Sequence, residues 1–377
     1  MKTTLRRSEF SGGRVRLARS FNGWTQAELG ERIGVTHQYV GYLETGHKLP
    51  TDLTVEAIAA STGFDAAFFY LPLVEEFRDE ECHFRRRSTT PVSVRTRVLA
   101  HGTLFGMLVG YIDKVIALPA DDVPTRRART PEDIEGAAEQ CRMQWGLGRD
   151  LPIKNLTRAV EWAGVVVTRF DGASAKIDAF SRAGKRSVVV LNTEKDAPSR
   201  TRFDLAHETG HLVMHGGLTT GDSDTEKEAD RFASALLLPR AGYVREFPRA
   251  HRIDWTALFR LKKRWGASVG AQVRRAYDLR LIDAAQYQRA YKYIAAKGWL
   301  KGEPEEPAVE QPELIPLSLA EIEKLFGTPP ADVCRRLSWG KEVFERVAGV
   351  PLREEQQKER GRVVQLDLIR AEKRTRS

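Results

Sequence analysis

Cysteine is scarce in this sequence, with 3 in 377 residues: Cys82, Cys141 and Cys334. Their number is odd and their spacing is wide, which excludes a disulfide framework and a Cys-x-x-Cys zinc site. We therefore expect reduced, structural thiols of the kind that cytoplasmic proteins carry.

Long apolar runs are also missing. A membrane span needs roughly 18–20 continuous apolar residues, and the longest candidate, residues 104–118, is interrupted by Asp113 and Lys114. The N-terminus lacks the apolar core of a signal peptide. The sequence thus predicts a cytoplasmic protein without a membrane partner.

Acidic residues are too few to balance the basic ones, and the net charge is +9. The imbalance is local: residues 1–72 hold eight Lys and Arg against seven Asp and Glu, whereas residues 241–301 hold fourteen against four. A solvated basic face and a nucleic-acid surface explain this surplus equally well.

The length indicates two or three domains. We expect a mostly α fold with a small α+β domain, and helices at 98–118, 131 onward and 155–163. The β-branched runs 165–168 and 188–191 predict short buried strands. The expected divisions are a helix-turn-helix domain at 1–72, a helical linker at 73–129, an α+β domain at 130–240, a helical extension at 241–302 and a tail at 303–377.

Two short helices with a tight turn are predicted near the N-terminus. Thr25 is a suitable cap for the first helix, Gly34 ends it, and Thr36 caps the second, 37–44. A helix with polar groups on its N-terminal half suits the major groove of double-stranded DNA. Candidate contacts to bases or phosphates are Gln26, Thr36, His37, Gln38, Tyr39, Tyr42 and Lys48.

This segment resembles the lambda-repressor-like (Cro/C1, Xre) helix-turn-helix domains. The resemblance rests on Gln26, Leu29, Gly34, Val35, Thr36, Leu43, Glu44, Gly46, Lys48 and Pro50. It implies a bundle that binds an operator in double-stranded DNA, usually as a homodimer. Gly30 departs from the family's usual alanine, although the position must be small for two helices to cross. The near-neutral charge leaves a small bundle for protein contacts as the alternative.

A His-Glu-x-x-His motif lies at 207–211 on a helical stretch. Residues four apart share a helix face, so His207 and His211 can reach a single ion. Glu208 then lies beside the ion, where it can serve as a general base. Imidazole and carboxylate ligands with one open position are typical of catalytic zinc.

A downstream helix supplies the third ligand. Glu228 precedes Phe232 and Leu236 at four-residue steps, so we expect Glu228 on the buried stripe and assign it to the metal. Glu226 is the alternative, which we interpret as a solvated acid at the helix N-terminus. His215 shares the face of both histidines, and it could bind metal, hydrogen-bond a ligand, stabilise an oxyanion or interact with the helix dipole.

These two helices resemble the ImmA/IrrE metallopeptidases, through His-Glu-x-x-His with His215 four residues on and Glu-x-Glu-Ala-Asp-Arg-Phe-Ala-x-x-Leu-Leu-Leu-Pro at 226–239. The resemblance covers about 130–240 well and 241–300 loosely. It implies a zincin-like peptidase of the gluzincin type, with one zinc ion per chain and a helix-turn-helix repressor protein as substrate. The oxyanion group is unassigned, with His215, Tyr243 and Arg231 as candidates.

Residues 255–282 predict a second helix-turn-helix-like unit. Its basic residues, Lys262, Lys263, Arg264, Arg274 and Arg275, could contact DNA phosphates, or the helices could simply cover the peptidase domain.

Taken together, the sequence predicts a transcriptional regulator whose zinc peptidase cleaves a repressor or the chain itself. Two other functions stay open. The metal site could be sensory or structural, or the protein could act like an antitoxin through protein contacts.

Overall fold

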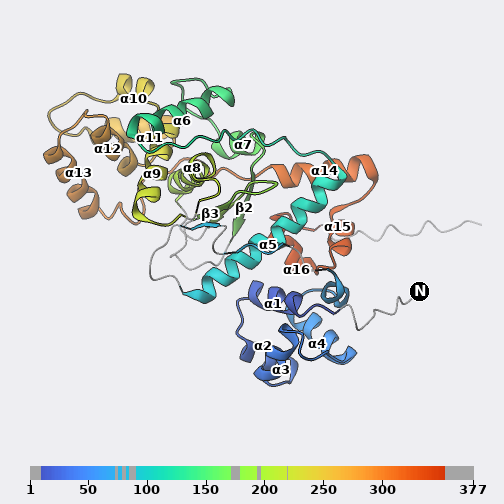
Figure 1. Cartoon of the computed structure of the whole chain (residues 1–377). Helices are drawn as coiled ribbons and strands as arrows, with labels where there is room; N and C mark the ends of the chain where they lie inside the picture. The colour runs from blue at the N-terminus through green and yellow to red at the C-terminus, as the bar shows by residue number, and fades with distance from the viewer. Residues whose placement is uncertain are drawn as a thin grey trace, which may run out of the picture.

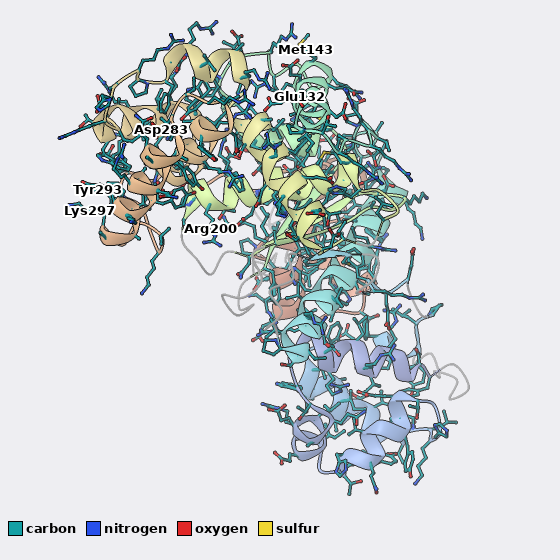
Figure 2. All side chains as sticks on the ribbon, turned by 60° about the vertical axis from the view of Figure 1, so that its left-hand side comes forward. Glu132, Met143, Arg200, Asp283, Tyr293 and Lys297 are labelled. Atoms are coloured by element: carbon teal, nitrogen blue, oxygen red, sulfur yellow. The ribbon has the colours of Figure 1, made fainter. Side chains whose placement is uncertain are left out.

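The structure is a computed structural model that describes residues 10–72, 75–78, 82–84, 91–170, 179–192, 197–218 and 220–352. Helices predominate in these residues, and their one sheet has four strands in the order β1-β3-β4-β2. The predicted fold class, mostly helical with a small α+β part, is confirmed. The molecule is elongated, with the N-terminal module at one end and the helix that carries Tyr293 and Lys297 at the other (Figures 1 and 2).

The N-terminal module is a bundle of short helices. Its elements are α1 (Gly12–Phe21), α2 (Gln26–Ile33), α3 (His37–Glu44), α4 (Asp52–Thr62) and the 3-10 helix η2 (Ala66–Tyr70). The predicted caps are confirmed, because the hydroxyls of Thr25 and Thr36 accept from backbone amides three residues on, at 3.2 Å each. Gly34 ends α2 with a φ of 70°, a conformation that favours glycine.

Gly30 lies where α2 crosses the start of α3. A Cβ built there would come 2.6 Å from the carbonyl oxygen of Val35 and 3.3 Å from the amide nitrogen of His37. Glycine therefore permits a closer approach than alanine would, which explains the departure from the family pattern.

The sheet consists of β1 (Cys82–Phe84), β2 (Val166–Phe170), β3 (Ala179–Arg182) and β4 (Val188–Asn192). β2 and β4 are parallel, while β3 is antiparallel to both β4 and β1. The two β-branched runs form the predicted strands. β1 and β3 were not predicted, because they are short and β1 follows a charged stretch.

Both faces of the sheet are buried, and successive residues point to different cores. Phe180, Val188 and Val190 pack into a core shared with the N-terminal module and with α5 (Val92–Val115). Ala179, Val189 and Leu191 pack into the second core, beneath α8 (Pro198–Met214). The sheet thus separates the N-terminal module from α8, as the two-residue period of a strand requires.

The second core is covered by helices on the far side of the sheet from α5. Besides α8 they are α6 (Pro131–Gln144), α7 (Leu156–Trp162), α9 (Ser223–Leu237), α10 (Arg240–Glu246), α11 (Trp255–Trp265), α12 (Val269–Asp278) and α13 (Ala284–Ala296). α6 begins as predicted, with the Thr130 hydroxyl accepting from the amide of Asp133. α11 and α12 form the predicted helix-turn-helix-like unit.

The segment predicted to be a tail packs, as far as residue 352, into the core that the N-terminal module shares with α5. Residues 353–377 lie outside the described part of the chain. The described segment forms α14 (Leu314–Phe326), α15 (Pro330–Arg336) and α16 (Lys341–Ala348). The amide of Gly340 donates to the carbonyl of Gly63 at 2.9 Å, and the Arg346 guanidinium lies 4.2 Å from the ring centre of Phe21. These helices therefore complete the core around the N-terminal module.

The five basic residues that we considered for DNA phosphates all pair with acidic side chains. Lys262 is fully buried and bonds Glu303 at 3.0 Å, and fully buried Arg275 pairs with Glu135. Ion pairs also engage Lys263 with Glu305, Arg264 with Glu246 and Arg274 with Asp278. Most of these acids lie outside the window in which the charge was counted.

Two further expectations can be compared with the described residues. All three cysteines are buried, and none of them forms a disulfide. No described helix combines the length and the apolar character that crossing a bilayer would require.

The joint between the C-terminal helices and the N-terminal module yields a stability prediction. Trp339, 2% exposed, forms a bridge with Phe64. We expect Trp339→Ala to lower the free energy of unfolding by about 3–5 kcal/mol, because it leaves a large cavity. Urea unfolding measures the loss. Leu317→Ala, at a 64% exposed position on α14, should change it by less than about 0.5 kcal/mol; equal effects would contradict the packing.

Candidate metal centre and DNA-contacting face

The candidate metal centre lies where α9 crosses α8. A Cβ added to Gly210 would come 2.9 Å from the ring of Phe232, so the two helices approach closely because position 210 has no side chain. His207 and His211 lie on either side of this glycine on one face of α8, and both are buried. The close crossing brings the first turns of α9 over both imidazoles.

The carboxylate that reaches the imidazoles is Glu226 and not Glu228. The Nε2 atoms of His207 and His211 are 3.1 Å apart, and the two oxygens of Glu226 lie 3.5 Å and 3.4 Å from them. Ligand atoms of these three residues all lie within 4.8 Å of one another. The expectation for Glu228 is corrected, since its Oε2 lies 2.8 Å from Nε2 of His215.

These spacings fit a zinc ion. Zinc bonds imidazole nitrogen and carboxylate oxygen at roughly 2.0–2.2 Å, which separates neighbouring ligands of a tetrahedron by about 3.3–3.5 Å. The 3.1 Å between the two Nε2 atoms is close to that edge, and each imidazole lies 3.4–3.5 Å from a different oxygen of Glu226. Three protein ligands leave a fourth position open, as in catalytic sites.

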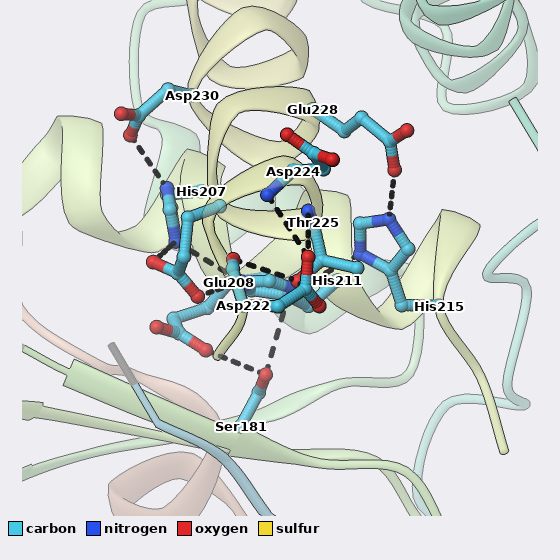
Figure 3. Close-up of polar contacts among 11 residues, drawn as sticks. Ser181, His207, Glu208, His211, His215, Asp222, Asp224, Thr225, Glu228 and Asp230 are labelled. Atoms are coloured by element: carbon cyan, nitrogen blue, oxygen red, sulfur yellow. Dashed lines mark hydrogen bonds and ion pairs between the residues drawn. The ribbon is translucent and has the colours of Figure 1, made fainter. Parts of the chain in front are cut away.

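A second layer of hydrogen bonds orients both imidazoles (Figure 3). Nδ1 of His207 lies 2.8 Å from Oδ1 of Asp230, and Nδ1 of His211 lies 2.9 Å from Nδ1 of His215. These contacts fit a tautomer in which Nδ1 of His211 donates to His215 and Nε2 of His215 donates to Glu228. In that tautomer Nε2 of His211 carries no proton, as a metal ligand requires. His215 therefore lies behind a ligand, and partners of this kind fix the tautomer and ring orientation of metal-binding histidines.

Glu208 lies on the sheet side of the centre. Its Oε2 accepts from the Ser181 hydroxyl of β3 at 2.6 Å, and the side chain is almost fully buried (Figure 3). Burial raises the pKa of Glu208 to about 8, against the opposing effects of His207 and Ser181. A positive ion would favour the carboxylate, so the site can hold Glu208 in the state that accepts a proton.

The two histidines differ in their affinity for protons. Burial lowers the pKa of His207, but hydrogen bonds to Asp230 and Glu226 outweigh it and raise the value to about 10. Burial lowers the pKa of His211 to about 4. Because a ligand nitrogen must be unprotonated, ion binding near neutral pH displaces a proton from His207.

A cavity of about 600 Å³ adjoins the centre at Asp230. It is lined by charged and aromatic residues, among them Phe203, Arg231, Tyr291 and Trp299. Arg231 stays an oxyanion candidate on this location. Tyr243 does not, because it is fully buried and its hydroxyl donates to the carbonyl of Gln272 at 2.9 Å.

The DNA-contact candidates divide into two groups. Thr36, His37, Gln38, Tyr42 and Lys48 are exposed, and Tyr39 is half-buried. The Lys48 ammonium lies 5.3 Å from the ring centre of Tyr42 and 5.9 Å from that of Tyr39, so these three residues form one patch at α3.

Gln26 is the exception among the candidates. Its Nε2 donates to Oε2 of Glu44 at 2.8 Å, and Glu44 also accepts two hydrogen bonds from Arg19. The side chain is half-buried, and it helps to hold α3 against α1 and α2. A DNA contact through Gln26 stays a prediction.

Comparison with known families supports both halves of this description. Residues 18–69 match the helix-turn-helix family, and residues 160–277 match the peptidase family described as the IrrE N-terminal-like domain. The two resemblances seen in the sequence are confirmed, and His207, His211, Glu226 and Glu208 all lie in the second match. A search of curated proteins found no match. Helices α5 and α14–α16 lie outside both matched regions.

The ligand assignment predicts different costs for the two glutamates. Glu226→Gln removes a ligand and should lower zinc affinity by more than the roughly 10–100-fold that loss of a second-layer partner costs. Glu228→Gln should stay within that range, since it alters only the bond to His215. Competition with a chromogenic chelator measures both affinities. A larger loss of zinc affinity for Glu228→Gln than for Glu226→Gln would indicate that Glu228 is the third ligand.

Proposed function

We propose that this chain is a DNA-binding transcriptional regulator that carries a zinc-dependent endopeptidase, and that the peptidase switches gene expression by cleaving a protein. The observation that carries the proposal is the convergence of His207, His211 and Glu226 beside the buried carboxylate of Glu208. The helix-turn-helix match in the same chain supplies the regulatory context.

The residues of the centre suit hydrolysis of an amide bond. Zinc, when bound, supplies a Lewis acid that polarises the peptide carbonyl and acidifies a water molecule. Glu208 accepts a proton from a water molecule while the oxygen of that water bonds to the carbonyl carbon. Glu208 then passes the proton to the amide nitrogen as the carbon–nitrogen bond breaks, which leaves a carboxylic acid and an amine. The acid then loses its proton to the amine, giving a carboxylate and an ammonium group.

Supporting groups keep this arrangement fixed. Ser181 holds one oxygen of Glu208 by its hydroxyl, and Asp230 and His215 hold the rings of the two histidine ligands. The cavity beside Asp230, with its aromatic and charged walls, suits side chains of a polypeptide substrate.

The N-terminal module is proposed to bind operator DNA through the exposed side of α3. Thr36, Gln38 and His37 can hydrogen-bond base edges or phosphates, and the Lys48–Tyr42 patch can contact the backbone. A homodimer on two half-sites is the arrangement that this docking geometry favours. The finer proposal for the peptidase is that its substrate is a helix-turn-helix repressor or this chain itself.

The alternative is a regulator whose metal site senses or stabilises without cutting. Glu208→Gln separates the two, because it removes the proton acceptor and keeps every ligand. We expect unchanged zinc binding and a loss of proteolysis of about 10²–10⁴-fold, measured on a candidate repressor by mass spectrometry. Retained regulation in cells with the Glu208→Gln protein would favour the sensory function.

The DNA proposal predicts an effect on salt dependence. Removing one phosphate contact by Lys48→Ala should weaken binding to all sequences and reduce the salt slope of log K by about 1. Fluorescence anisotropy of the full chain with operator DNA at several salt concentrations measures the slope. Lys292→Ala, at an exposed position of α13, serves as control. An identical slope in all three proteins would remove Lys48 from the interface.

A further inference from the structure

We propose that residues Cys82–Phe84 occupy the edge of β3 as a mimic of an extended peptide substrate. The inference rests on the proposed peptidase function and names the segment that regulates it. The β1 strand then restrains the enzyme until it leaves.

β3 is the strand that adjoins the general base. Ser181, in the middle of β3, directs its hydroxyl to the carboxylate of Glu208 at 2.6 Å. Its other strand neighbour is β4, so without β1 the β3 backbone would form the open edge of the described sheet. An open edge presents amide and carbonyl groups that pair with any extended peptide. A peptide paired there would run beside the strand that holds Glu208.

β1 has the position and direction of such a peptide. It is antiparallel to β3, and its central residue, His83, is the partner of Ser181 in the register. Cys82 and Phe84 pair with Arg182 and Phe180. β1 has only three residues, too few to be stable without its neighbour, so it can exchange with a competing strand.

The segment before β1 is fastened to β3 by side chains. Glu75 forms an ion pair with Arg182, and the Arg182 guanidinium lies 4.5 Å from the ring centre of Phe77. The Phe77 ring is buried and meets Phe180 edge-on, with 6.4 Å between the ring centres. Two residues of β3 therefore recognise the linker by side chains in addition to the backbone pairing.

The same segment also contacts the DNA-binding module. Glu76 bonds the guanidinium of Arg16 on α1 at 3.0 Å. Residues Glu75–Phe77 thus contact both α1 and β3. A movement of the N-terminal module on DNA would therefore displace the segment that leads to β1.

An intramolecular occupant has a calculable effect. A tethered segment acts at an effective concentration on the order of 1 mM. For a free peptide with a dissociation constant of about 100 µM, such competition lowers the apparent affinity about tenfold.

The test measures docking and not hydrolysis. A fluorescein-labelled peptide with the sequence of residues 79–87 is titrated with zinc-loaded full chain that carries Glu208→Gln, and anisotropy reports binding. In the same background, Cys82→Gly, His83→Ser and Phe84→Gly together replace the strand. We expect the variant with the replaced strand to bind the peptide about tenfold more tightly than the chain with native β1. In that variant, added peptide should slow amide hydrogen exchange at residues 179–182.

A milder variant covers the case in which the triple replacement disturbs folding. Glu75→Lys places a positive charge beside Arg182 at a side chain that is 79% exposed, so it weakens the linker contact without touching a core. It should also tighten peptide binding. Glu56→Lys makes the same charge change at an exposed site on α4 and should leave binding unchanged.

The outcomes are distinct. The inference is overturned if the chain with native β1 and the triple replacement bind the peptide with equal affinity. It is also overturned if the peptide slows amide hydrogen exchange outside residues 179–182. Tighter binding at β3 supports it, even if the wild-type chain hydrolyses no protein. If the peptide binds at β3 and the wild-type chain hydrolyses no protein, the proposed peptidase function is wrong and the inference about the β3 edge is retained.

Discussion

The close crossing of α8 and α9 at Gly210 is the constraint on which the functional site depends. Only a residue without a side chain lets the ring of Phe232 approach α8 at this distance. That approach sets which residue of α9 lies over the two imidazoles, and a shift of one helical turn would present another part of α9. The identity of the third ligand is therefore a property of helix packing, decided away from the ion itself.

The sheet transmits this arrangement to the rest of the molecule. Its alternating side chains belong to two cores, one beneath the metal centre and one around the N-terminal module. Ser181 faces the general base while its neighbour Phe180 faces the other core. A slip of one residue in β3 would exchange these two side chains, so the strand register supports both the candidate metal centre and the junction with the N-terminal module.

Local signals predicted much of this from sequence. The caps Thr25, Thr36 and Thr130, and the pair His207 and His211, depend on spacing within one helix, and spacing is visible in a sequence. The choice between Glu226 and Glu228 was wrong because both lie near the start of α9, and only the crossing angle with α8 decides between them. The signal that could have helped was Asp230, four residues after Glu226 on the same helix face. The partners of Lys262 and Arg275, and the edge pairing of β3, join residues far apart in the chain, where no local pattern exists.

The C-terminal helices have a consequence for how the chain folds. Gly340, Trp339 and Arg346 close the core around α1 and α4, and they are among the last described residues to leave the ribosome. At typical synthesis speeds of about 5–20 residues per second, the N-terminal bundle waits tens of seconds for its final contacts. A nascent chain can therefore complete its DNA-reading module only after the peptidase has emerged. Fragments that end before residue 339 would lack the contacts by which Trp339, Gly340 and Arg346 complete the N-terminal bundle.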